Sequence, residues 1–72
     1  MNIETTLNEG IKILKKFKIA NPQLDSEILL SNSIKKDKKH IILNPKELLN
    51  SEQAKKFKNL IERRKKGEPI AY

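Results

Sequence analysis

The sequence lacks cysteine, tryptophan and valine, and its 72 residues include only two glycines, three prolines and one histidine. Without cysteine there are no disulfides and no thiolate metal sites, and His40 alone does not hold zinc without carboxylate partners. Gly10 and Gly67 stand near opposite ends of the chain, which excludes a glycine-rich loop for a phosphate or a dinucleotide. No apolar run approaches the roughly 20 residues of a membrane span, and residues 1–4 do not resemble the start of a signal peptide. We therefore expect a soluble, cytoplasmic protein.

The small size limits the core. A chain of 72 residues and 8.4 kDa forms one domain that buries about 60% of the surface its unfolded chain exposes. Its core has to be built from isoleucine and leucine together with Phe17 and Phe57. Such a domain has a stability on the order of 3 to 5 kcal/mol, and we expect it to be a monomer.

The formal charge of +7 is unevenly distributed. Residues 1–34 contain as many acidic as basic side chains, so the whole excess lies in residues 35–72. Such a field attracts RNA or an acidic protein surface, whereas the simpler interpretation is a lysine-rich composition on solvated helix faces. The lysine pairs lack interleaved aromatic residues for base stacking, so nucleic-acid binding would be weak and salt-dependent.

The apolar spacing of the first half predicts two helices. An apolar stripe over residues 3–18 indicates the first, and it comprises Ile3, Leu7, Ile11, Ile13, Leu14 and Phe17. Gly10 within it either weakens this helix or marks a close helix–helix approach. Asn21-Pro22 predicts the start of a second helix, over about 22–33, with Asn21 as its side-chain cap. Its predicted buried face is formed by Leu24, Ile28 and Leu29.

The second half predicts two or three further helices. Asp37 is expected to cap a short helix through residues 40–43. The order Asn-Pro-Lys-Glu at 44–47 matches a capping box and predicts another short helix that carries Leu48 and Leu49. The last helix is predicted over about 51–66. Its capping pair is Asn50 and Gln53, its buried residues are Ala54, Phe57, Leu60 and Ile61, and Gly67 ends it.

The sum is an all-α bundle of four to five helices over residues 1–67, followed by the start of an extended linker at 68–72. No pair of groups has the spacing of a catalytic site, so the sequence predicts no catalytic, cofactor or metal residue. Asp25 and Glu27 lie in the first turns of the second helix, where the helix dipole favours negative charge. We expect Arg63 or Arg64 to pair with Asp25 or Glu27 across the bundle.

Several segments together resemble one family. These are residues 21–30, the apolar Ile41-Ile42-Leu43, the helix with Phe57, Leu60 and Ile61, and the ending Arg63-Arg64-Lys65-Lys66-Gly67-Glu68-Pro69-Ile70-Ala71-Tyr72. They resemble the N-terminal domain of the peptide chain release factor glutamine methyltransferases, the HemK/PrmC family. The resemblance covers essentially the whole chain, and the ending is its most specific part.

The resemblance implies a helical domain joined to a C-terminal Rossmann-like methyltransferase domain, so that Tyr72 is an artificial stop within a longer enzyme. That enzyme uses S-adenosyl-L-methionine to methylate the glutamine of the Gly-Gly-Gln loop in class I release factors. Asn44-Pro45 is followed by Lys46-Glu47, so it is not the catalytic Asn-Pro-Pro-Tyr motif of the family. The chain alone is therefore expected to be inactive and to hold no cofactor.

The expected role is recognition of the release factor, which tends to be acidic. The candidate contact residues are Lys55, Lys58, Lys65 and Lys66. Two alternatives stay open at this point. One is a stand-alone basic module that binds RNA or DNA, which a steep salt dependence would reveal. The other is a purely structural bundle that shields or orients a neighbouring domain.

Overall fold

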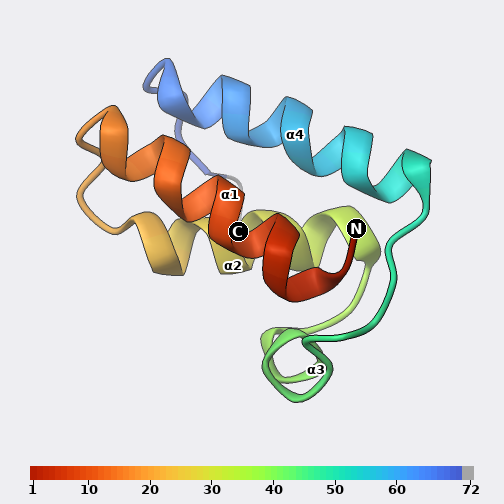
Figure 1. Cartoon of the computed structure of the whole chain (residues 1–72). Helices are drawn as coiled ribbons and strands as arrows, with labels where there is room; N and C mark the ends of the chain where they lie inside the picture. Colours follow the sequence, from red (N-terminus) through yellow and green to blue (C-terminus); the bar gives the residue numbers. More distant parts are fainter. Residues whose placement is uncertain (71–72) are drawn as a thin grey trace.

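The fold is an all-α bundle, as the sequence predicts. The computed structural model describes residues 1–70, so the last two residues of the predicted linker, Ala71 and Tyr72, lie outside it. The described part contains four helices: α1 (Ile3–Lys16), α2 (Pro22–Ile34), α3 (Lys38–Leu43) and α4 (Ser51–Lys65). Helices α1, α2 and α4 pack on one another, and the short α3 packs on α2 at one side of the bundle (Figure 1).

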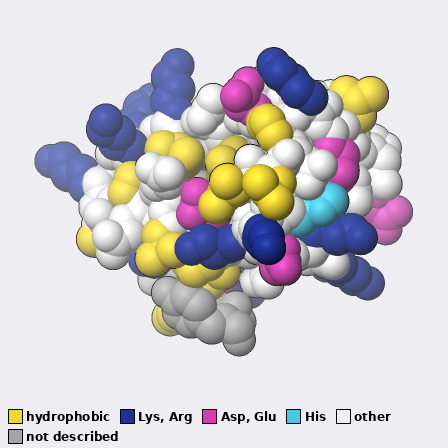
Figure 2. Space-filling view, turned by 90° about the horizontal axis from the view of Figure 1, so that it is seen from below, with side chains coloured by type: hydrophobic (Ala, Val, Ile, Leu, Met, Phe, Trp, Pro, Cys, Tyr) yellow, Lys and Arg dark blue, Asp and Glu magenta, His cyan; other side chains and the backbone are white. Residues whose placement is uncertain are grey.

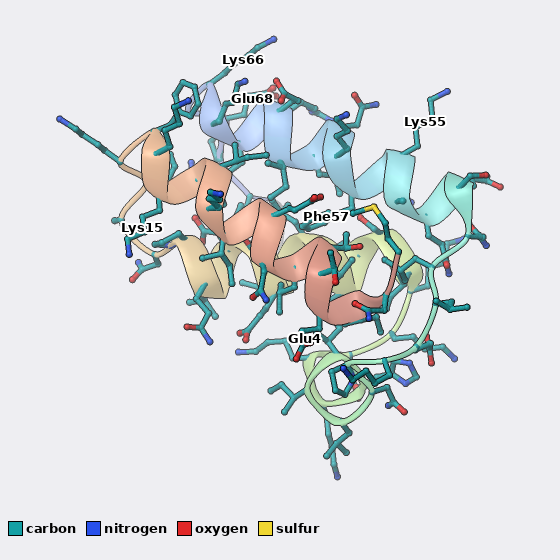
Figure 3. All side chains as sticks on the ribbon, in the orientation of Figure 1. Glu4, Lys15, Lys55, Phe57, Lys66 and Glu68 are labelled. Atoms are coloured by element: carbon teal, nitrogen blue, oxygen red, sulfur yellow. The ribbon has the colours of Figure 1, made fainter. Side chains whose placement is uncertain are left out.

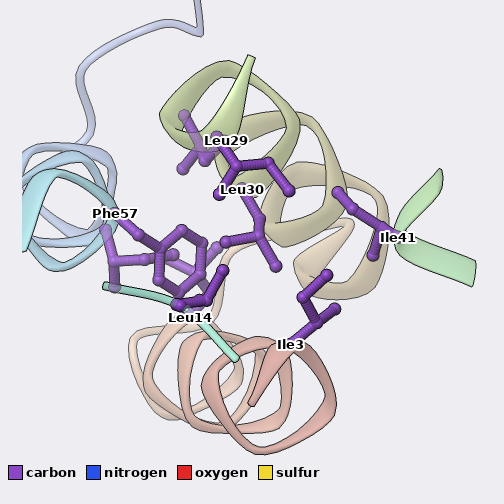
Figure 4. Packing of buried hydrophobic residues seen from close by; sticks show 9 residues of the cluster. Ile3, Leu14, Leu29, Leu30, Ile41 and Phe57 are labelled. Carbon is purple, nitrogen blue, oxygen red and sulfur yellow. The ribbon is translucent and has the colours of Figure 1, made fainter. Parts of the chain in front are cut away.

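Every helix and the segment before α4 contribute side chains to the core. Figure 4 shows how its side chains meet between the helices. The buried apolar residues are Ile3, Leu14, Leu29, Leu30, Ile34, Ile41, Leu49, Phe57 and Ile61. Helix α3 contributes only Ile41 to this cluster.

Helix α1 begins as expected and ends two residues early. The Oδ1 atom of Asn2 accepts a hydrogen bond of 2.8 Å from the backbone N–H of Thr5, which satisfies one of the free amides of the first turn. The chain leaves the helix at Phe17 and turns left-handed at Lys18, where φ is 59°. The prediction that Phe17 is a core residue is wrong, because it lies beyond the helix end and is 47% exposed. The ammonium of Lys65 lies over its ring, 4.8 Å from the centroid.

Gly10 marks a close approach of α1 and α4. A Cβ atom built on Gly10 would lie 2.6 Å from Cζ of Phe57 and 3.1 Å from Cδ1 of Ile61. Real Cβ atoms essentially never come within 3.0 Å of a neighbour, as this one would at Phe57. Of the two interpretations that the sequence allowed, the structure therefore supports close helix packing.

Helix α2 lies at the centre of the bundle, and two details of its prediction are wrong. The side chain of Asn21 makes no cap hydrogen bond, and Leu24 is exposed while Leu30 is fully buried. The reason is that α2 contacts α1, α3 and α4. Its buried residues are therefore spread around the helix and are not confined to one face. Even its polar residues Asp25 and Ser26 are buried.

The segment between α3 and α4 does not form the predicted short helix. Asp37 caps α3 as expected, with its Oδ1 atom 2.9 Å from the backbone N–H of His40. Residues 45–50 instead form a turn and an extended stretch that pairs with the start of α1. The N–H groups of Ile3 and Glu4 donate hydrogen bonds of 2.9 Å to the carbonyls of Glu47 and Pro45. This pairing satisfies free amides of the first turn of α1, and it leaves Leu48 77% exposed.

Helix α4 matches its prediction closely. Asn50 and Gln53 form the expected capping box, with hydrogen bonds of 2.7 and 3.0 Å. Phe57 and Ile61 are buried, and Ala54 and Leu60 are half-buried. Gly67 follows the helix end with a φ of 94°, a conformation that residues with a Cβ rarely adopt.

Candidate functional site

Arg64 joins three parts of the chain at one guanidinium group. Its Nε atom lies 3.0 Å from Oδ2 of Asp25, and its Nη1 atom donates a hydrogen bond of 3.1 Å to the carbonyl of Glu68. The Asp25 side chain is only 6% exposed and that of Arg64 is 23% exposed. The structure thus brings together one of the pairs that the sequence suggested, and the pair ties α2 to α4 and to the segment after it. Removing one partner of such a pair leaves a buried charge uncompensated.

The other two residues of that prediction have different partners. The Oε1 atom of Glu27 lies 3.8 Å from Nζ of Lys38, so Glu27 faces α3 rather than α4. Arg63 is exposed and pairs with Glu68 at 3.2 Å. The hydrogen bond to Glu68 raises the pKa of the Arg63 guanidinium above its ordinary value. Asp25 therefore connects α2 to α4, and Glu27 connects α2 to α3.

Residues 68–70 fold back onto the bundle. The backbone N–H of Glu68 donates to the carbonyl of Arg63 at 3.3 Å, and Ile70 packs against the core cluster. Arg63 pairs with the carboxylate of Glu68, and Arg64 donates a hydrogen bond to its carbonyl. The direction in which the chain leaves α4 is therefore fixed by specific contacts.

The four candidate lysines do not form one cluster. Lys55 lies near the start of α4 and Lys66 beyond its other end (Figure 3). Lys65 is engaged within the chain, since its Nζ atom lies 2.9 Å from Oε2 of Glu62 and also over the ring of Phe17. That hydrogen bond from Lys65 lowers the pKa of Glu62. Lys55 and Lys58, in contrast, border a groove between α1 and α4.

The groove between α1 and α4 has a volume of about 280 Å³ and is mostly apolar. Its lining residues from α1 include Thr6, Gly10 and Ile13, and those from α4 include Ala54, Lys55, Phe57, Lys58 and Ile61. The helices are close at Gly10 and Phe57, and the small side chain of Ala54 leaves the space beside them open. The sequence gives no sign of this groove, because it depends on how α1 and α4 are paired in three dimensions.

A second surface feature that the sequence did not reveal is on α3. Ile42 and Leu43 are both more than half exposed. Seen from the side of α3, hydrophobic side chains gather next to the single histidine, with lysines or arginines and carboxylates around them (Figure 2). His40 itself lies at the boundary of the core, and its Nε2 atom is 2.9 Å from Oε1 of Glu47.

Two kinds of binding site can be compared with the described residues: a metal cluster and a glycine turn for a cofactor. Within residues 1–70 no group of three or more His, Cys, Asp or Glu side chains is placed to hold a metal ion. The same residues do not fit S-adenosyl-L-methionine, because Gly10 is packed against Phe57 inside a helix and Gly67 ends α4 in open space. Neither glycine can form the strand-to-helix turn that receives such a cofactor. No helix among these residues combines the length and apolar character that crossing a membrane requires.

The fold and these contacts define a small, basic, all-α domain. Comparison with known proteins gives its family: the model of the PrmC N-terminal domain matches residues 5–72. The chain therefore belongs to the PrmC N-terminal domain family. The sequence resemblance to this family is confirmed by a comparison that covers nearly the whole chain.

Curated relatives agree with this family. A protein of Buchnera aphidicola named release factor glutamine methyltransferase is 44% identical over 72 residues, which cover all of this chain and 26% of the relative. The protein of that name from Clostridium botulinum is 38% identical over the whole chain and 25% of its own length. A bifunctional methyltransferase of Rickettsia bellii is 39% identical over 99% of this chain and 13% of the relative. The chain thus spans about a quarter or less of these relatives. No solved structure matches it.

Proposed function

We propose that this chain is the substrate-recognition domain of an S-adenosyl-L-methionine-dependent methyltransferase. The substrate of that enzyme is the glutamine of the Gly-Gly-Gln loop in class I release factors, and the chain by itself does not catalyse the transfer. One observation carries the proposal: the family model matches residues 5–72, and relatives aligned over the whole chain are named release factor glutamine methyltransferase.

A recognition role is supported by where charge and exposed apolar surface lie. The formal charge of +7 originates in residues 35–72, and a release factor with an acidic surface would be attracted to it. The groove between α1 and α4 offers apolar surface beside Lys55 and Lys58. Specific protein interfaces combine such an apolar centre with a polar rim.

A catalytic role for the chain alone lacks support in the described residues. Its most buried carboxylate, Asp25, is held by Arg64 at 3.0 Å, so it serves as a structural anion. His40 pairs with Glu47 on the surface, away from any enclosed cavity with convergent polar groups. We therefore assign methyl transfer to a C-terminal methyltransferase domain of the kind that the family resemblance implies.

The proposal is tested by mixing the chain with a purified bacterial class I release factor and radiolabelled S-adenosyl-L-methionine. The expected result is binding of the release factor without transfer of the label to it. Incorporation of label into the glutamine above the background without the chain would contradict the assignment of chemistry to another domain. Failure of the chain to bind the release factor at all would contradict the recognition role.

A further inference from the structure

The groove between α1 and α4 is the feature that the proposed function leaves unexplained. Helices α1 and α4 run side by side in the bundle (Figure 1). Gly10 and Ala54, two residues with little or no side chain, both line the groove. Its floor is formed by Phe57 and Ile61, which belong to the buried core. The groove is therefore lined by two long helices, with Met1 as the one further lining residue among those described.

One wall of the groove contains an unused hydrogen-bonding group. Thr6 is 4% exposed, and its Oγ1 atom has no hydrogen-bond partner among the described residues. The carbonyl of Asn2, one turn earlier, already accepts the backbone N–H of Thr6 at 3.1 Å. A buried hydroxyl without a partner is unfavourable.

The rim of the groove carries unpaired positive charge. Lys55 and Lys58 are exposed, and neither has an ion-pair partner within 4.0 Å in the part of the chain that the structure describes. Lys58 acts on Glu62 only through the longer-range attraction that contributes to the lowered pKa of that carboxyl. Among the described residues that line the groove, Glu9 on α1 is the one with an acidic side chain. The α4 side therefore favours carboxylates.

We infer that the groove binds an acidic segment of the release factor that inserts one large apolar side chain between α1 and α4 and places carboxylates beside Lys55 and Lys58. A volume of about 280 Å³ is below the usual range of cofactor and drug sites, roughly 300 to 1,000 Å³. It suits a single apolar anchor of the kind that dominates binding energy in protein interfaces. This inference rests on the proposed function. Of the candidate lysines it assigns Lys55 and Lys58 to the contact with the release factor. It leaves out Lys65, which contacts Glu62 and Phe17 within the chain.

The test is a set of binding titrations with a purified bacterial class I release factor. Ala54→Leu fills the groove with a good helix former and leaves both lysines in place; the expected effect is at least a tenfold loss of affinity. Ala20→Leu, on the exposed connection between α1 and α2, is the matched control, with a change below twofold. The double variant Lys55→Glu, Lys58→Glu is also expected to lose at least tenfold. Its charge-matched control is the double variant Lys36→Glu, Lys39→Glu, for which we expect the affinity to fall by less than threefold.

The outcomes separate the two proposals. If the unaltered chain does not bind the release factor, the recognition role and the groove site fail together. If the chain binds and both groove variants bind as tightly as it does, the groove site is wrong and the recognition role stands. If the lysine variant loses affinity and Ala54→Leu does not, the proposal that an apolar side chain enters the groove is wrong. Circular dichroism establishes whether each variant is folded. If Ala54→Leu does not fold, the affinity of the Lys55→Glu, Lys58→Glu variant is compared with that of its charge-matched control, and equal affinities would overturn the groove site.

Discussion

The three long helices and the stretch from Asp37 to Asn50 are held together in different ways. Helices α1, α2 and α4 share the core, the close contact at Gly10 and the pair between Asp25 and Arg64. The stretch around α3 is attached by Ile41 and Leu49 and by backbone hydrogen bonds to the start of α1, while Ile42, Leu43 and Leu48 are exposed. Both parts are rich in leucine and isoleucine. Hydrophobic content alone therefore does not tell which part carries the stability.

The largest expected difference between the two parts comes from matched leucine truncations. Leu30 is fully buried and Leu43 is exposed. Leu30→Ala removes core contacts and leaves a cavity, which costs about 2 to 5 kcal/mol, as much as the whole stability of a domain this small. Leu43→Ala should change the free energy of unfolding by less than about 0.5 kcal/mol. Urea denaturation followed by circular dichroism measures both, and equal losses would show that α3 is as tightly packed as the long helices.

The next effect concerns the two neighbouring arginines of α4. Arg64→Ala leaves the buried carboxylate of Asp25 without its partner, and we expect a loss of about 3 kcal/mol in the free energy of unfolding, at the low end for a buried pair because Arg64 is 23% exposed. Arg63 is exposed and pairs only with Glu68, so Arg63→Ala should leave the stability nearly unchanged. Thermal unfolding of the two variants makes the comparison. A greater loss for Arg63→Ala would mean that the exposed pair, rather than the buried one, holds the end of α4.

The smallest expected effect is at Gly10. Gly10→Ala gains up to about 1 kcal/mol of helix propensity but forces Phe57 aside, which costs about 1 to 3 kcal/mol. The expected net result is a loss of about 1 kcal/mol. In a Phe57→Leu background the clash is relieved, so the same substitution should become neutral or stabilising. A double-mutant cycle by chemical denaturation measures this coupling. A coupling near zero would mean that α1 and α4 are not in close contact at Gly10.

The sequence predicted the helices with strong local signals and failed where distant parts of the chain decide the structure. Asn50 and Gln53 satisfy each other within one turn, so α4 could be located from its own residues. The same kind of pattern at residues 44–47 forms no helix, because carbonyls there accept the free amides of Ile3 and Glu4. Phe17 was misjudged since its stripe continued past the true helix end.

The candidate site divides in the same way. The sequence suggested that Arg63 or Arg64 pairs with Asp25 or Glu27, and the structure contains one of these combinations, Arg64 with Asp25. The groove between α1 and α4 could not be anticipated, since its lining comes from two helices that are far apart in sequence. The lysines were named from composition and position alone. The structure distinguishes the pair at the groove from Lys65, which is engaged within the chain.

The central claim is that this domain recognises the release factor while the chemistry lies elsewhere in the enzyme. A competition assay tests it most directly: methylation of a release factor by the Clostridium botulinum relative, 38% identical to this chain, is measured with increasing amounts of the chain. The account predicts that the chain lowers the initial rate by raising the apparent KM for the release factor, with kcat unchanged. A rate that does not change at a large excess of folded chain over release factor would contradict it.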